Sequence, residues 1–161
     1  MINNIAAIER HLFKDCEGGI YHVSILQRKK DGHSHNVSIT DFHINSQAYW
    51  EILKPGIIAL CQTYKARAYI NINAKSPKQI VGKMADTILE SLKQSIFKPL
   101  TVLTHSVSSI NSNSNKVWII DVDDLSVDLQ PLIDNINACK SGYSENVIDI
   151  LPTINGHHIL T

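Results

Sequence analysis

The chain has 161 residues, of which 43% are hydrophobic and 19% charged. This composition is sufficient for a buried core and differs from that of intrinsically disordered segments. Lys plus Arg and Asp plus Glu number 15 each, and this zero net charge argues against strong attraction to nucleic acid through net charge alone. The three cysteines form no CxxC pair, the N-terminus carries no secretory signal, and no apolar run approaches the roughly 20 residues of a membrane span. We therefore expect one cytoplasmic domain over residues 1–161, with no membrane partner.

The first half of the chain alternates between helical and strand patterns. Apolar residues at helical spacing predict a first helix from Ile5 to Phe13. Two strands follow as a hairpin with a long tip, and the next helix is capped by Ser46 and broken at Pro55. A third strand precedes a helix that begins at Ser76-Pro77. The three expected strands cover residues 20–27, 37–44 and 66–73.

The second half begins with a segment that we interpret as a flexible polar loop over residues 104–116. A strand over 117–123, a helix through Leu129 to Ile136 and a strand over 147–151 follow, and Asn155-Gly156 then turns the chain into a returning strand. This order predicts an α+β fold with a mixed, mostly antiparallel sheet that has hairpins at both ends and is covered by helices.

Two carboxylates follow an apolar run in the strand Val117–Asp123. Asp121 and Asp123 are two residues apart, so their side chains leave the same face, roughly 6.5–7 Å apart at the backbone. Carboxylates this close repel unless a cation or a proton lies between them, and Mg²⁺ prefers such oxygen ligands. The alternative is that Asp123 and Asp124 cap the following helix while Asp121 is a solvated strand end, and the spacing alone favours neither.

A second candidate feature is the turn Asn155-Gly156 followed by His157 and His158. A histidine on a strand after a glycine turn can present its imidazole, and backbone N–H groups, to a phosphate. The alternative is an ordinary hairpin with two half-exposed histidines. A β-α-β connection returns the chain to the same sheet, so this turn and the Asp121 strand are expected to lie side by side.

Together these features resemble the archaeo-eukaryotic primase superfamily, which includes primase-polymerases and small phage and plasmid primases. Val117 to Asp123 is similar to that family's strand of apolar residues followed by Asp-x-Asp, and Thr153-x-Asn155-Gly156-x-His158 resembles its second motif. The resemblance covers the second half of the chain. It implies an RRM-like core in which Asp121 and Asp123 bind Mg²⁺ or Mn²⁺ and His158 contacts a nucleotide triphosphate.

The resemblance also implies further contacts with the nucleotide. Asn155 and Gly156 would contribute the turn, and Arg67, with Asn71, resembles an Arg- and Asn-bearing strand found upstream of the acidic motif in small phage-type relatives. Arg67 shares a sheet face with Tyr69, a combination that suits either a nucleotide groove or an ordinary exposed face. The basic run Arg28–Lys30 suits either a nucleic-acid backbone or a solvated turn.

One departure from the family concerns its third motif, an acidic residue on a later strand, because the sequence ends at Thr161. Asp149 is a candidate substitute, and a fragment, a natural truncation and a non-catalytic relative all stay open. The function implied is a metal-dependent nucleotidyltransferase of DNA replication that acts on nucleotide triphosphates and nucleic acid. The alternatives are a binding module of the same fold without turnover, or a metal-dependent phosphodiester hydrolase that uses the same aspartates.

Overall fold

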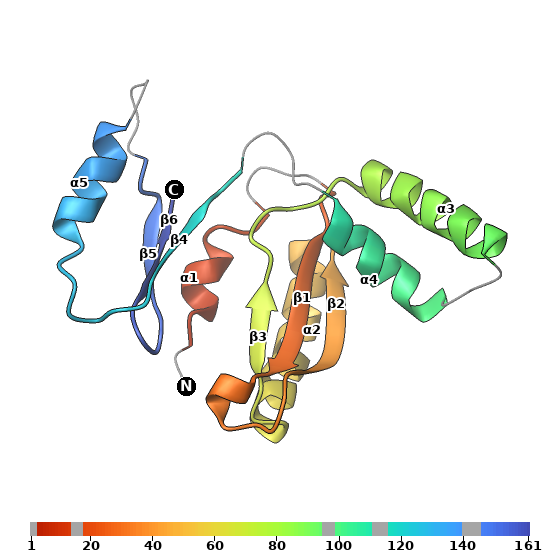
Figure 1. Ribbon diagram of the computed structural model, residues 1–161, viewed down its shortest axis with the longest axis horizontal. Coiled ribbons are helices and arrows are strands. Elements are labelled where there is room, and N and C mark those ends of the chain that lie inside the picture. Colours follow the sequence, from red (N-terminus) through yellow and green to blue (C-terminus); the bar gives the residue numbers. More distant parts are fainter. Residues whose placement is uncertain (1–2, 14–17, 95–98, 111–115, 140–145) are drawn as a thin grey trace. The chain divides into compact units, whose positions relative to one another are not determined.

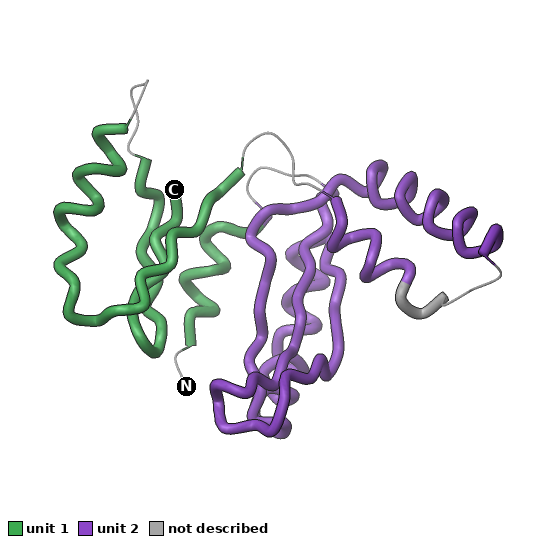
Figure 2. Tube along the Cα trace, viewed as in Figure 1, with its two compact units in different colours: residues 1–12, 116–161 green, residues 13–115 purple. Residues whose placement is uncertain are grey.

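The structure is a computed structural model that describes residues 3–13, 18–94, 99–110, 116–139 and 146–161. The chain divides into two compact units (Figure 2). Unit 1 comprises residues 1–12 and 116–161, and unit 2 comprises residues 13–115. The expected α+β class is confirmed, whereas the expected single sheet is wrong, because the strands form two separate three-stranded antiparallel sheets.

The sheet of unit 2 has the strand order β2-β1-β3 (Figure 1). Its strands are β1 (Tyr21–Gln27), β2 (Val37–Ile44) and β3 (Arg67–Ile70). β1 and β2 form the predicted hairpin, and its tip contains a short 3₁₀ helix, η1 (Lys29–Asp31), which ends at Gly32 with a φ of 91°. Gly32, which follows Asp31, adopts this left-handed conformation without the strain that a side chain would cause.

Helix α2 (Gln47–Thr63) packs against one face of this sheet. The hydroxyl of Ser46 accepts a hydrogen bond from the Tyr49 N–H at 3.3 Å, as its predicted capping role requires. The expected break at Pro55 is wrong, because the helix continues through this exposed proline. Buried side chains on both sides of the proline hold the helix on the sheet and outweigh the lost backbone hydrogen bond; they are Trp50, Ile57 and Cys61.

Two further helices of unit 2 pack on each other, α3 (Pro77–Lys93) and α4 (Pro99–Ser109). α3 begins at Ser76-Pro77 as predicted. The expectation of a flexible loop over residues 104–116 is wrong for residues 104–109, because these belong to helix α4. Residues 111–115 lie outside the described residues. Val102 and Val107 of α4 are buried, and their burial favours the helix although the surrounding sequence is polar. Within the helix, the hydroxyl of Ser108 donates to the Thr104 carbonyl.

Unit 1 contains a sheet in which the last strand lies in the middle, in the order β4-β6-β5. Both outer strands run antiparallel to β6 and are therefore parallel to each other, joined by α5. Figure 1 shows α1 and α5 on opposite sides of this sheet. The elements are α1 (Ile5–Glu9), β4 (Ile119–Val122), α5 (Gln130–Ala138), β5 (Asp149–Pro152) and β6 (His157–Leu160).

The expected hairpin at the C-terminal end is confirmed by the pairing of β5 with β6. Ile159 and Leu160 on β6 are fully buried, as expected for the central strand of the sheet. Among the helices that the structure describes, none combines the length and the apolar content needed to cross a membrane.

Candidate functional site

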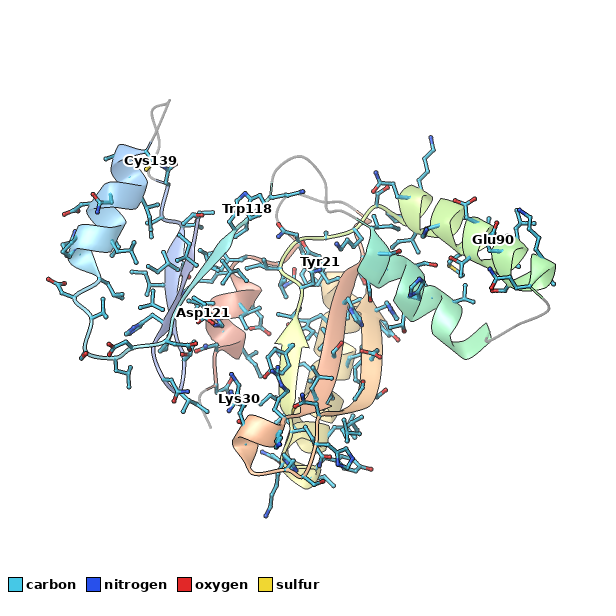
Figure 3. All side chains as sticks on the ribbon, in the orientation of Figure 1. Tyr21, Lys30, Glu90, Trp118, Asp121 and Cys139 are labelled. Carbon is cyan, nitrogen blue, oxygen red and sulfur yellow. The ribbon has the colours of Figure 1, made fainter. Side chains whose placement is uncertain are left out.

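Asp121 and His158 face each other across neighbouring strands of unit 1. The register of β4 and β6 places the two residues directly opposite, and Asp121 Oδ1 lies 3.3 Å from His158 Nε2. Their side chains remain 56% and 40% exposed, respectively, so a ligand can reach both. Figure 3 shows Asp121 on the β4 ribbon. The structure thus brings together the two features that the sequence predicted to lie side by side.

The turn between β5 and β6 lies against the backbone that leaves β4. The Thr153 N–H donates to the Gly156 carbonyl at 2.8 Å and closes the turn. A Cβ atom at Gly156 would lie 1.7 Å from the Val122 carbonyl oxygen and 2.9 Å from the Asp124 nitrogen, closer than any side chain allows. Gly156 is therefore required for this close approach of two backbones, which places the Asn155-Gly156 turn at the end of the acidic strand.

The other carboxylates near the end of β4 differ in their environment. Asp123 is exposed just beyond the strand. Asp124 accepts hydrogen bonds from the Ser126 hydroxyl at 2.7 Å and from the Ser126 N–H at 2.8 Å, and these lower its pKa. Asp124 thus holds a local turn, while Asp128, which sequence reasoning missed, accepts from the Gln130 N–H at the start of α5. Its position just before the Gln-Pro start of that helix is the signal that could have identified it.

Asp149, the candidate third carboxylate, is engaged with the residues that follow α1. Its Oδ2 lies 2.9 Å from Arg10 Nη2 and 2.7 Å from His11 Nε2. Burial of this carboxyl group raises its pKa, but the hydrogen bonds from His11, Arg10 and the Ile150 N–H, together with the charge of Arg10, outweigh burial and leave the pKa lowered. Asp149 shares a sheet face with Asp121, yet it lies two strands and two residues away, about 12 Å between Cα atoms. It cannot complete a metal site with Asp121.

The fit of the unit 1 residues to Mg²⁺ or Mn²⁺ follows from these positions. Among the described residues, no three His, Cys, Asp or Glu side chains gather as they would around a metal ion. Asp121 is paired with His158, and Asp149 is held by Arg10 and His11. The residues that the structure describes in unit 1 therefore do not form a metal centre from protein ligands alone.

Arg67, the remaining predicted nucleotide contact, lies on β3 of unit 2. It is opposite Leu26 in the sheet, and its guanidinium group forms an ion pair with Asp31 of η1. This partner accounts for the burial of the Asp31 side chain, which is only 15% exposed. The role of Arg67 toward a nucleotide stays a prediction.

Sequence reasoning missed a polar cluster on the β1–β2 hairpin. The cross-strand pairs are His22 with His43 and Ser24 with Asp41, and the two imidazole rings stack with centroids 5.1 Å apart. Ser24 Oγ donates to Asp41 Oδ1 at 2.5 Å, and His22 Nε2 lies 3.0 Å from the same oxygen. Because the hydroxyl donates to the carboxylate rather than to an imidazole, the cluster does not form a Ser-His-Asp nucleophile.

The chemistry of this cluster centres on His43. Burial first, and the neighbouring His22 second, lower the pKa of His43, against a smaller opposing effect of Asp41. Its Nε2 atom is buried and has no hydrogen-bond partner in the part of the chain that the structure describes. The signal that could have found the cluster was alternation, since the polar residues occupy every second position on both strands of a predicted hairpin.

Comparison of the chain with protein-family models, with curated proteins and with solved structures finds no match in any of the three. Its function is therefore inferred from the residues and their geometry.

Proposed function

We propose that this protein binds a nucleoside triphosphate at the exposed Asp121–His158 pair, as a binding module of primase-polymerase type. The observation that carries the proposal is the direct cross-strand contact between these two side chains, with the Asn155-Gly156 turn beside them. The resemblance to primases assigns a metal-binding carboxylate to Asp121 and a nucleotide contact to His158, and this supports the proposal.

The chemistry of the pair suits the phosphate end of a nucleotide. A carboxylate beside an imidazole orients the ring, and an imidazolium donates to the carboxylate through one nitrogen and to a phosphate oxygen through the other. His158 then donates to a phosphate oxygen, and the exposed side chain of Asn155 lies in the adjacent turn. Asp121 repels a bare triphosphate, so the nucleotide binds together with its own Mg²⁺ or Mn²⁺, which needs only one or two carboxylates in addition to phosphate oxygens.

Nucleotidyl transfer to nucleic acid is the second candidate function. The Asp121–His158 contact favours it, because the resemblance assigns both residues to the active site of an RRM-like primase core. Against it stands the engagement of Asp149 with Arg10 and His11, which leaves the site without a nearby third carboxylate from the described residues. Binding without turnover is therefore the function that we put first, and the free thiols of Cys61 and Cys139 suit a cytoplasmic location for it.

The experiment is a titration with a fluorescent ATP analogue, with and without Mg²⁺. We expect His158→Gln to weaken binding by roughly tenfold or more, as the loss of a charge-assisted hydrogen bond implies. With Mg²⁺, Asp121→Asn should also weaken binding, whereas without Mg²⁺ the same change should strengthen it by removing repulsion. The matched control is Asp134→Asn, a surface carboxylate on α5, which should change neither value.

Two outcomes separate the candidate functions. If the wild-type protein does not bind the nucleotide, or binds it as tightly after His158→Gln, the proposed site is wrong. Primer synthesis by the wild type that is abolished in Asp121→Ala would replace the binding module with the nucleotidyltransferase.

A further inference from the structure

We propose that one end of the unit 2 sheet binds single-stranded nucleic acid. The surface, which we call the basic end, combines cations and tyrosines from the β1–β2 tip and from the connection between α2 and β3. Its residues are Arg28, Lys29, Lys30, Tyr64, Lys65, Arg67 and Tyr69. It shares no residue with the Asp121–His158 pair, so it stands or fails independently of the proposed function.

The fold brings the two segments of the basic end together through hydrogen bonds to the backbone. Gln27 Nε2 donates to the Tyr64 carbonyl at 2.7 Å, and the His33 imidazole donates to the Lys65 carbonyl at 2.9 Å. Arg67 pairs with Asp31 across the same end of the sheet. Figure 3 shows Lys30 on the short helix η1 at this end of the sheet. Segments more than 30 residues apart in sequence therefore present one surface.

Charge distinguishes this surface from the rest of the chain. Residues 28–36 and 64–69 carry five cations and one carboxylate, although the whole chain has a formal net charge of zero. The single carboxylate, Asp31, is paired with Arg67. Lys29, Lys30 and Lys65 are exposed, and none of them forms an ion pair within the described residues. An excess of cations confined to one surface attracts phosphates, which net charge alone does not predict here.

The tyrosines indicate which polyanion fits. Tyr64 is 44% exposed beside Lys65, and the Arg28 guanidinium carbon lies 5.6 Å from the centre of the Tyr69 ring. Single strands are bound by this combination, because cations follow the phosphates while unpaired bases stack on aromatic rings. A duplex or an acidic protein would use the cations alone. The tyrosines therefore favour a single strand over either.

The backbone at Lys65 gives an independent indication. Lys65 has a φ of 48°, a left-handed conformation in which Gly or Asn is less strained than Lys. Its carbonyl is held there by His33. The chain thus carries a lysine where the backbone conformation favours Gly or Asn, as expected if the positive charge of Lys65 binds a phosphate.

The test measures the binding of labelled oligothymidylate and oligouridylate, each of about 20 nucleotides, by fluorescence anisotropy over a range of salt concentrations. The combined change Lys29→Ala and Lys30→Ala should weaken binding by at least fivefold. It should also reduce the slope of log affinity against log salt by about 1.4, because each phosphate that a lysine neutralises on a single strand adds about 0.7 to that slope. The matched control is Lys78→Ala with Lys83→Ala, which removes the same charge from the exposed surface of α3 and should change affinity by less than twofold.

A second variant tests the stacking. Tyr64→Leu keeps the charge and the backbone, so it should weaken binding by about fivefold or more and leave the salt slope unchanged. The proposal is overturned if the wild type does not bind either oligonucleotide at low salt, if both lysine pairs have equal effects, or if a duplex or polyglutamate binds as tightly as the single strand.

Discussion

Alanine at position 156 should destabilise unit 1 by about 3 kcal/mol or more. The added Cβ would lie 1.7 Å from the Val122 carbonyl oxygen, so the two backbones must separate by about 1.3 Å to reach even the 3.0 Å limit that real Cβ atoms respect. Both clashing groups are backbone atoms, which cannot move aside as a flexible side chain can. The cost is therefore at or above the upper end of the roughly 1–3 kcal/mol that is typical of overpacked sites.

The measurement is the free energy of unfolding from urea titration, with amide hydrogen exchange of β4 and β6 to locate the destabilised strands. Gly82→Ala in α3 is the matched control, because its Cβ would meet nothing within 4 Å and alanine is the better helix former. It should stabilise by about 0.5–1 kcal/mol. If Gly156→Ala leaves both the unfolding free energy and the protection of β4 unchanged, the close approach of the turn to β4 is wrong.

Three further predictions concern a cap and two titrating groups. Ser46→Ala should lower the unfolding free energy by about 1 kcal/mol, because the hydrogen bond from the Tyr49 N–H is lost. Ser76→Ala loses no capping hydrogen bond and should have little effect in the same urea titration. Equal effects of the two changes would contradict the capping role of Ser46. Because the pKa of Asp149 is lowered on folding, this carboxylate contributes fully to the free energy of unfolding above the unfolded pKa of 3.8, and the contribution is lost as pH falls through the folded pKa. Asp149→Asn should therefore flatten the acid side of a curve of unfolding free energy against pH. An unchanged acid side would refute this. Burial is the main reason that the pKa of His43 is lowered below 6.5, so the unfolded state binds a proton at a higher pH than the folded state. The free energy of unfolding should therefore rise with pH in the range below 6.5, and His43→Phe should reduce this slope. If the slope is not reduced, the pH dependence comes from another group.

Much of the secondary structure was predictable, because the patterns that encode it are local. The β1–β2 hairpin, the start of α3 and the β5–β6 turn all follow from turn residues, capping residues and apolar spacing within short windows. The errors at α4 and at Pro55 have the same local origin. The polar serines up to Ser109 predict a loop, although Val102 and Val107 of α4 are buried. Pro55 predicts a break, although buried residues on either side hold α2 together.

The pairing of Asp121 with His158 is a feature that local sequence patterns do not predict. The order of residues is enough to predict a carboxylate strand and a Gly-His turn on neighbouring strand units. It does not predict that β6 lies between β4 and β5, an arrangement of the folded chain that sets Asp121 opposite His158 and leaves Asp149 with Arg10 and His11. The contact of Lys65 with the β1–β2 tip likewise exists only in the folded chain. The physical reason is that strand order and register depend on contacts between distant residues, whereas helix, strand and turn patterns depend on neighbours in the chain.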